Sequence, residues 1–272
     1  MTPSSSCGVQ AVIFDLSGTT IDYGSRGPVV ALVELFSRHG VKVTNEEARG
    51  PMGMHKKDHI WTMLTDPAIG QRWEAANGAA PSRRVLEELY QDFAPLQTEV
   101  LKHHCDVIPG VPEVVRALRE RGIKIASTTG FDSAMLGDLI QQVRAGGYAP
   151  DLFVCPDQVG KGRPAPWMAF HAARQLDVYP MKTFVKVGDT TKDIDEAHAA
   201  GMWAVSVVRT GNEVGLSQEA LERLSAVERD AVIFAARARL AASGPHYLID
   251  SAADLIPIVD EITARLARGD RP

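Results

Sequence analysis

The apolar residues of this chain form short, nearly unbroken runs separated by longer amphipathic segments. From about Pro109 onward, each run is followed by a segment with helical spacing and with helix start or stop signals. Runs that are apolar on both faces suit the strands of a parallel sheet covered by helices on each side. We therefore predict an α/β protein with a doubly wound parallel sheet. The predicted strands are residues 12–14, 123–127, 152–155, 184–187, 204–208 and 247–249.

Residues 23–106 break this alternation, because they contain helical patterns and no convincing strand. The predicted helices are residues 28–39, 45–49, 56–64 and 82–104. Thr44 and Glu47 form a capping-box pair, Ser82 can cap the last helix, and Pro95 is expected to kink or break that helix. Glycine and proline at 24–27 and 108–110 mark where the chain leaves and re-enters the core. We thus predict a core domain of residues 1–22 and 107–272, and an inserted helical cap domain of residues 23–106, called the insert below.

The composition narrows the range of partners. The chain has 34 acidic and 29 basic residues, a formal net charge of -5 and no long run of either sign. This argues against a nucleic-acid surface or a basic membrane-binding face and favours a small-molecule partner. No segment is long and apolar enough to span a membrane, and the first ten residues lack the features of a secretion signal. Cys7, Cys105 and Cys155 are far apart and outside any CxxC pattern, so we expect a reducing, cytoplasmic location.

Three acidic residues follow predicted strands. Asp15 comes directly after the first strand, and Asp189 and Asp193 span another strand end and the first turn of the next helix. Ligands of open α/β sheets bind at the carboxyl ends of the strands. Three acids at that edge would make an oxygen site suited to Mg²⁺. Taken separately, Asp15 fits a turn cap better, and the other two fit a helix cap with a first-turn acid at least as well.

Two further loops add groups that bind phosphate. Thr129 and Gly130 end the sequence STTG, which offers hydroxyl and backbone N–H donors, and Arg163 in KGRP offers a guanidinium. Phosphoryl transfer needs a nucleophile, a metal-binding acid, hydroxyl donors and a cation. Together with the acids, these residues predict a phosphoryl pocket.

The whole set resembles the four ordered motifs of the haloacid dehalogenase superfamily, which match Asp15, Thr129, Arg163 and the pair Asp189 and Asp193. The resemblance implies that Asp15 is a nucleophile that becomes an aspartyl-phosphate. Typical phosphatases of that superfamily carry a second aspartate two positions later as general acid and base, whereas this chain has Ser17 there. A serine is a poor proton donor to an alkoxide leaving group, so Ser17 disfavours phosphate-ester hydrolysis.

A lysine in the insert has unusual neighbours. Lys56 lies in GPMGMHKKDH, residues 50–59, near a predicted helix start. Met52, His59 and Ile60 fall on the same face of that helix. Burial there and the positive end of the helix dipole would lower the lysine pKa and supply the neutral amine that a Schiff base needs. Considered alone, Lys56 is more often a solvated surface lysine, because lysines are seldom buried.

With this lysine motif, the chain resembles the phosphonatase branch of the superfamily, the phosphonoacetaldehyde hydrolases, from about residue 12 to beyond residue 215. The motifs are FDxxGTTxDYG, PMGxxKxDH, STTG, GRPxPW and KVGDTxxD. The resemblance implies that Lys56 condenses with the aldehyde, that Asp15 attacks phosphorus and that His59 handles protons. It also implies one Mg²⁺ ion, which Asp15, the Ser17 backbone carbonyl and Asp189 hold while Asp193 orients them. The implied substrate- and phosphoryl-binding residues are Met52, Thr129, Gly130 and Arg163.

The implied reaction hydrolyses the C–P bond of a small phosphonate, phosphonoacetaldehyde, to acetaldehyde and phosphate. An iminium on Lys56 would accept the electrons of that bond, so no acid is needed at Ser17. One alternative is a sugar-phosphate phosphatase or phosphomutase of the same superfamily, and the missing acid counts against it. The other is a non-catalytic interaction domain, which the complete motif set disfavours.

The resemblance also implies a homodimer formed through the insert. The predicted helix at residues 28–39 carries apolar side chains on more than one face, wider than packing within one domain requires. These are Val29, Val30, Leu32, Val33, Leu35 and Phe36. The alternative is that this helix is sandwiched between the core and the rest of the insert.

Overall fold

The computed structural model describes residues 8–137 and 139–272. Cys7 and the other residues before Gly8 in the predicted core lie outside the described residues. The described chain contains a six-stranded, fully parallel sheet of order β3-β2-β1-β4-β5-β6. This confirms the predicted α/β class, and each strand begins and ends within one residue of the predicted run. The strands are β1 (Ala11–Phe14), β2 (Lys124–Thr128), β3 (Leu152–Val154), β4 (Phe184–Gly188), β5 (Trp203–Val207) and β6 (Tyr247–Ile249).

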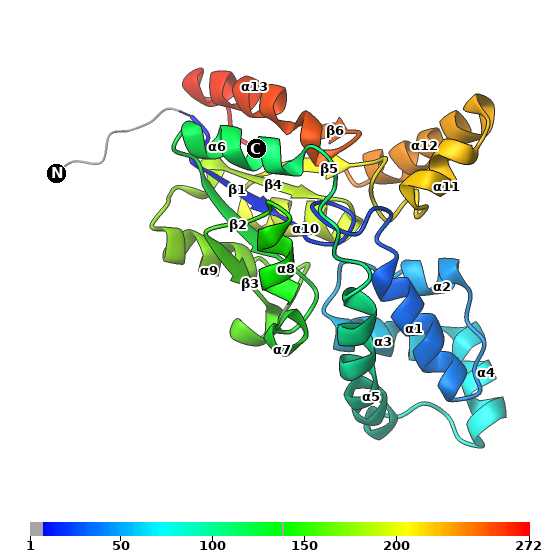
Figure 1. Cartoon of the computed structure of the whole chain (residues 1–272). Helices are drawn as coiled ribbons and strands as arrows, with labels where there is room; N and C mark the ends of the chain where they lie inside the picture. The colour runs from blue at the N-terminus through cyan, green and yellow to red at the C-terminus, as the bar shows by residue number, and fades with distance from the viewer. Residues whose placement is uncertain (1–7, 138) are drawn as a thin grey trace.

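Helices cover both faces of this sheet (Figure 1). Helices α6 (Val111–Glu120) and α13 (Leu255–Ala267) pack together on one face, while α9 (Trp167–Leu176) and α10 (Thr191–Ala200) contact the other. Alternate residues of β1 enter the two resulting apolar clusters, which explains its unbroken apolar run. The other helices of the core are α7 (Ser133–Leu136), α8 (Leu139–Ala145), α11 (Gln218–Arg223) and α12 (Ala226–Ala241), with 3₁₀ turns η1 (Pro156–Gln158), η2 (Met181–Thr183) and η3 (Ala252–Asp254).

The carboxyl ends of three adjacent strands are aligned. Phe14 at the end of β1 pairs with Ser127 of β2 on one side and with Val187 of β4 on the other. The residues that follow these strands therefore emerge together at one edge of the sheet. The chain runs outward from β1 through β2 to β3 and then returns to β4, and ligands of open sheets bind at such a reversal of strand order.

Between β1 and β2 the chain forms five helices that lie beyond this edge (Figure 1). They are α1 (Gly27–Arg38), α2 (Asn45–Arg49), α3 (Lys56–Thr65), α4 (Pro67–Asn77) and α5 (Arg83–Leu101). The capping box of Thr44 and Glu47 and the cap at Ser82 are confirmed. Of the kink or break expected at Pro95, the break is wrong, because α5 continues through it to Leu101 with buried apolar residues on both sides of the proline.

Helix α4 was not predicted. Only Ile69 and Trp73 are buried in it, too few to show a helical period. It is fixed instead by its ends: Asp66 caps the N-terminus with two hydrogen bonds, Pro67 begins the helix, and Gly78 ends it in the left-handed conformation at φ +74°. None of the described helices is long and apolar enough to cross a bilayer.

Most of the apolar surface of helix α1 is buried within the chain. Val29, Leu32, Leu35 and Phe36 are buried, and α1 packs mainly against α5. Only Val30 of the six apolar residues is exposed, at 47%. Helix α1 therefore packs within the insert, and the surplus apolar face that we expected is absent from it. The homodimer remains a prediction from family resemblance.

The two segments that join the insert to the core run side by side. The backbone N–H of Asp22 donates to the carbonyl of Asp106 at 3.1 Å, and that of Ile108 donates to the carbonyl of Thr20 at 2.9 Å. Asp22 has φ +55° and Ser25 has φ +48°, a conformation that costs free energy in residues other than glycine. The Asp22 carboxylate offsets part of that cost by accepting a hydrogen bond from the N–H of Gly27 at 2.9 Å.

Candidate active site

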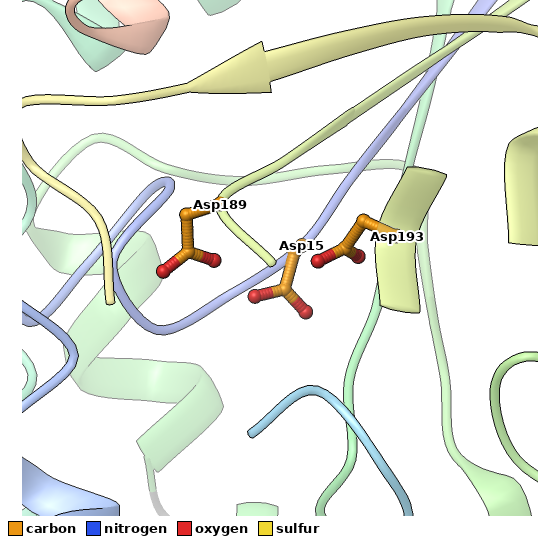
Figure 2. A group of neighbouring side chains, drawn as sticks. All are labelled: Asp15, Asp189 and Asp193. Carbon is orange, nitrogen blue, oxygen red and sulfur yellow. The ribbon is translucent and has the colours of Figure 1, made fainter. Parts of the chain in front are cut away.

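Three aspartates meet at the aligned edge of the sheet. Asp15 follows β1, Asp189 follows β4 and Asp193 lies in the first turn of α10, and Figure 2 shows Asp15 between the other two. Each offers an oxygen, and these oxygens all lie within 4.8 Å of one another. All three side chains are buried. Burial and the neighbouring Asp15 and Asp193 charges raise the pKa of Asp189 well above its usual value. The three carboxylates therefore repel one another when they are ionised.

Asp189 is held in place from two sides. Its Oδ2 accepts a hydrogen bond from the backbone N–H of Asn212 at 2.7 Å, and its Oδ1 accepts one from the Thr19 hydroxyl at 3.2 Å. Gly18 makes this approach possible, because a Cβ atom there would lie 2.1 Å from Asp189 Oδ2. Thr19 and Asn212 were not singled out from the sequence, which carries no signal for Asn212 because it acts through its backbone.

Asp193 is surrounded by donors. Its Oδ1 lies 3.1 Å from both Arg163 Nη1 and Lys186 Nζ, and its Oδ2 accepts from the Thr190 hydroxyl at 2.6 Å. Although burial opposes ionisation, these two cations and the hydrogen bonds lower the pKa of Asp193 below its usual value. Both carboxylate oxygens are therefore engaged by protein groups, as expected of a residue that orients the site.

Arg163 connects these acids to Asp15. Its Nη2 lies 2.6 Å from Asp15 Oδ1, and its Nε lies 3.2 Å from Glu196 Oε2. Lys186 also reaches Glu196, at 3.0 Å. Lys186 and Glu196 were missed in the sequence. The available signals were a charged residue inside a strand that is apolar on both faces, and an acid three residues after Asp193 on the same helix face.

The buried charges of this cluster do not balance. The carboxylates of Asp15, Asp189, Asp193 and Glu196 face the two buried cations Arg163 and Lys186. Carboxylate oxygens are preferred ligands of Mg²⁺, and a cluster whose carboxylates outnumber the cations that they contact suits a divalent cation. The backbone carbonyl of Ser17 is at the same edge, between Asp15 and Gly18. The donor set therefore fits the predicted magnesium site.

A small cavity separates this cluster from the insert. It is lined by the predicted site residues Asp15, Ser17, Met52, Lys56, Thr129, Gly130 and Arg163. Ser25, Pro28, Gly53, Phe131 and Thr190 complete its wall. The free space is about 20 Å³, enough for roughly one water molecule. Residues from the insert and the core thus close on one small space, and His59, Asp189 and Asp193 lie outside its wall.

Lys56 is the first residue of α3 and is only 3% exposed. Its Nζ lies 3.5 Å from Met52 Sδ and 5.2 Å from the centre of the Phe131 ring. Burial lowers the pKa of Lys56 to about 8, although the Asp15 charge opposes this shift. The surface-lysine alternative is therefore wrong. Met52 precedes the helix in a turn instead of sharing its face, because α3 begins at Lys56, yet it still reaches the amine.

His59 lies behind Lys56 in the interior of the insert. Its Nε2 donates a hydrogen bond to the carbonyl of Ala48 at 2.9 Å, so Nδ1 is the unprotonated nitrogen of the neutral ring. Burial and the neighbouring Lys56 hold the pKa of His59 well below its usual value. Nδ1 is buried and has no hydrogen-bond partner among the described residues. His59 follows Lys56 by three residues, so the two residues lie on the same side of α3.

Two glycines let the insert approach the core. A Cβ atom at Gly130 would lie 2.3 Å from the carbonyl oxygen of Met54, and one at Gly53 would lie 2.3 Å from Thr190 Oγ1. Arg163 Nη1 donates to the carbonyl of Gly53 at 3.3 Å. The loop before α3 therefore touches the same arginine that binds Asp15.

Arg49 at the end of α2 makes a second contact with the core. Its Nη1 donates to the carbonyl of Gly24 at 2.9 Å and to Asn212 Oδ1 at 3.1 Å, and its Nη2 donates to the carbonyl of Gly215 at 2.8 Å. Asn212 in turn holds Asp189. The sequence did not single out Arg49, because an arginine that binds mainly backbone carbonyls has no motif of its own.

Comparison with known proteins finds relatives that match most of this chain. The haloacid dehalogenase-like hydrolase family matches residues 9–201. A phosphonoacetaldehyde hydrolase of Nitratidesulfovibrio vulgaris is 42% identical, covering 97% of this chain and 94% of that protein. One of Bacillus cereus is 41% identical, covering 93% and 96%. The crystal structure of a phosphonoacetaldehyde hydrolase like protein from Oleispira antarctica is 40% identical and superposes with a TM-score of 0.96, over 100% of this chain and 99% of that one.

Proposed function

Because the chain belongs to the haloacid dehalogenase-like hydrolases, and within them to the phosphonoacetaldehyde hydrolases, we propose that it cleaves its substrate through an imine on Lys56 and a phosphorylated Asp15. The substrate is phosphonoacetaldehyde, and the products are acetaldehyde and phosphate. One observation carries the proposal: a buried amine from the insert and a buried carboxylate from the sheet open onto the same cavity.

The reaction needs both groups. Breaking a C–P bond directly would leave an unstabilised carbanion. Condensation of the neutral Lys56 amine with the aldehyde releases water and gives an imine, whose protonated form accepts the electrons of the C–P bond. A lowered lysine pKa favours this step, since about a tenth of an amine with a pKa of about 8 is neutral at pH 7.

Asp15 then attacks phosphorus. An oxygen of Asp15 forms a bond to phosphorus while the C–P bond breaks, and its electron pair enters the iminium to give an enamine. Proton transfer to the enamine carbon and hydrolysis by water release acetaldehyde and free Lys56. A second water hydrolyses the aspartyl-phosphate to phosphate and restores Asp15. No alkoxide leaves at any stage, so an acid at Ser17 is not required.

The remaining residues assist these steps. Arg163 and the loop of Thr129 and Gly130 bind the phosphoryl oxygens, as their position beside Asp15 on the cavity wall supports. Met52 packs against the Lys56 amine and keeps it from water. We assign the proton transfers of the imine to His59, whose free Nδ1 supports that role.

We assign one Mg²⁺ to Asp15, the Ser17 carbonyl and Asp189, with Asp193 orienting them. When bound, the ion would neutralise charge on the phosphoryl oxygens and on the crowded aspartates. The excess of buried carboxylates over cations in this cluster supports the assignment.

Borohydride reduction tests the proposal. The enzyme is incubated with phosphonoacetaldehyde and borohydride, and peptide mass spectrometry locates the reduced adduct. The adduct should appear on Lys56 and be absent from Lys56→Arg, because a guanidinium stays protonated and forms no imine. Lys57→Arg is the matched control, because the Lys57 amine pairs with Glu87 at 2.6 Å outside the cavity wall. The control should form the Lys56 adduct unchanged. An adduct on Lys57, or none, would reject the assignment of the imine to Lys56.

A further inference from the structure

A group of polar side chains connects the insert to the core one residue away from Lys56. His55 precedes Lys56, and Asp132 follows Phe131, whose ring lies near the Lys56 amine. The Nε2 of His55 lies 2.9 Å from Asp132 Oδ1, and the Tyr90 hydroxyl of α5 donates to Asp132 Oδ2. One acceptor in the core thus receives a donor from the residue before α3 and a donor from α5 of the insert.

The carboxylate of Asp132 is the acceptor in both bonds. His55 must carry its proton on Nε2 to donate, and the Tyr90 hydroxyl donates its only proton. Burial alone would raise the pKa of Asp132, but the bonds from His55 and Tyr90 outweigh it and hold that pKa below its usual value. Hydrogen bonds to an ionised carboxylate are about twice as strong as those between neutral groups.

The backbone beside this group is docked as well. The N–H of Lys56 donates to the carbonyl of Gly130 at 3.1 Å, so the first residue of α3 is bonded to the cavity loop of the core. Residues 54–56 therefore lie along residues 130–132, with the His55 contact next to the reactive amine. Movement of the insert away from the core would break both contacts together.

The other charged groups near His55 and Tyr90 do not take the place of Asp132 as a contact between the insert and the core. Asp58 Oδ2 lies 3.9 Å from His55 Nδ1, and Lys57 lies 5.8 Å from the centre of the Tyr90 ring while it pairs with Glu87. All of these groups belong to the insert and move with it. Asp157 of the core is engaged by the backbone N–H of Ser133 at 3.0 Å.

We propose that His55, Tyr90 and Asp132 form a latch that holds the insert against the core and positions Lys56 in the cavity. This inference rests on the function proposed above, because the proposed imine requires the Lys56 amine to be held in the cavity. His55, Tyr90 and Asp132 are positioning residues, since they act through Lys56 and lie outside the cavity wall.

Acetylation of the ligand-free enzyme tests the latch directly. A soluble N-hydroxysuccinimide acetate is applied at pH 9, and peptide mass spectrometry follows Lys56 relative to the exposed Lys42 of the insert. His55→Ala should raise the relative rate at Lys56 about tenfold, because losing a bond to a half-buried charge favours the open arrangement. Asp132→Ala should raise it at least as much, because Asp132 also accepts from Tyr90. The double variant should show no further increase over Asp132→Ala, because His55 has already lost its partner there.

The matched control is a second histidine–aspartate pair that does not reach the core. His39 Nε2 lies 3.2 Å from Asp92 Oδ2, and both residues belong to the insert. His39→Ala should leave acetylation of Lys56 unchanged. An equal increase in this control, no increase in the two latch variants, or additive increases in the double variant would overturn the proposal.

A conservative variant separates positioning from folding. His55→Gln keeps an N–H donor and should restore most of the protection of Lys56, and thermal unfolding of every variant shows whether the fold is kept. The pH midpoint of Lys56 acetylation should also move up from about 8 in His55→Ala, as water reaches the amine. Because no substrate is present, these results stand even if borohydride finds no imine, which would reject the proposed function alone.

Discussion

On the proposed imine mechanism, the environment of Lys56 sets the pH at which the amine becomes reactive. Burial disfavours the ammonium form and lowers its pKa to about 8, so the amine gains its reactive form as pH rises through that value. We predict that the initial rate of borohydride-trapped adduct rises with pH and has its midpoint near 8, and not near the value of about 10.4 for a free lysine. A midpoint near 10 would mean that Lys56 is solvated in the working enzyme.

The same shift affects stability, with a defined sign. Below about pH 8 the folded protein bears the full cost of burying a charged lysine. As pH rises from 8 towards the unfolded value, the unfolded chain binds more protons than the folded one, so this cost is progressively removed.

Substitution of Ser17 shows whether its backbone carbonyl or its side-chain hydroxyl matters for activity. We predict that Ser17→Ala keeps activity within about threefold, because the backbone carbonyl remains and the lost hydroxyl is buried without a hydrogen-bond partner among the described residues. Asp189→Ala should lower activity more than about a hundredfold and remove magnesium binding measured by titration calorimetry. A nearly inactive Ser17→Ala enzyme that still binds Mg²⁺ would show that the hydroxyl has a catalytic role.

Among individual residues, the sequence predicted the polar side chains of the site that lie in the loops following the strands. Asp15, Thr129, Arg163 and Asp189 were identified because their chemistry and their order along the chain restrict each other. Lys186 and Glu196, which pair with each other and with Asp193 or Arg163, were not, since they come from inside a strand and a helix. Their contacts depend on which faces pack together, and that is decided by the whole fold.

For helices and strands, the sequence predicted those elements whose own residues show the apolar pattern or the end signals. The strands were found within one residue of their bounds, most directly β1, β4 and β5, whose residues are all buried, whereas β3 and β6 are only partly buried. Helix α4 was missed because it buries only two residues, and its local caps at Asp66 and Gly78 fix its ends. A kink or break was expected in α5 because packing along its length could not be read from Pro95, and in α5 tertiary packing outweighs the local preference for a break.

The connecting segments should change when ligand binds. The cavity leaves about 20 Å³, far less than a phosphonoacetaldehyde molecule occupies, so the insert must open to admit substrate. We predict that amide exchange at residues 22–26, 52–59 and 106–110 slows when Mg²⁺ and a non-reactive phosphonate bind. Peptides of β4, buried in either arrangement, are the control. Unchanged exchange in a ligated sample would indicate a permanently closed site.

For the whole molecule, we predict a homodimer formed through the insert. Light scattering at micromolar concentration should give about twice the chain mass of 29.5 kDa. Since most of α1 is buried within the chain, Val30 is its one exposed large apolar side chain, and Val30→Glu should dissociate a dimer that uses this helix. A mass near 29.5 kDa for the unmodified protein would contradict the prediction.

The paired connecting segments have a consequence for how such enzymes diversify. Because Asp22 and Asp106 are hydrogen-bonded neighbours, the insert leaves and returns at one point, ahead of α6 in the connection between β1 and β2. It is a continuous module whose exchange would leave the strand register intact. The exchange would, however, remove the contacts that Gly53 makes with Arg163 and that Arg49 makes with Asn212. On the proposed mechanism, a replacement insert would therefore have to supply these contacts to the core as well as a new reactive group.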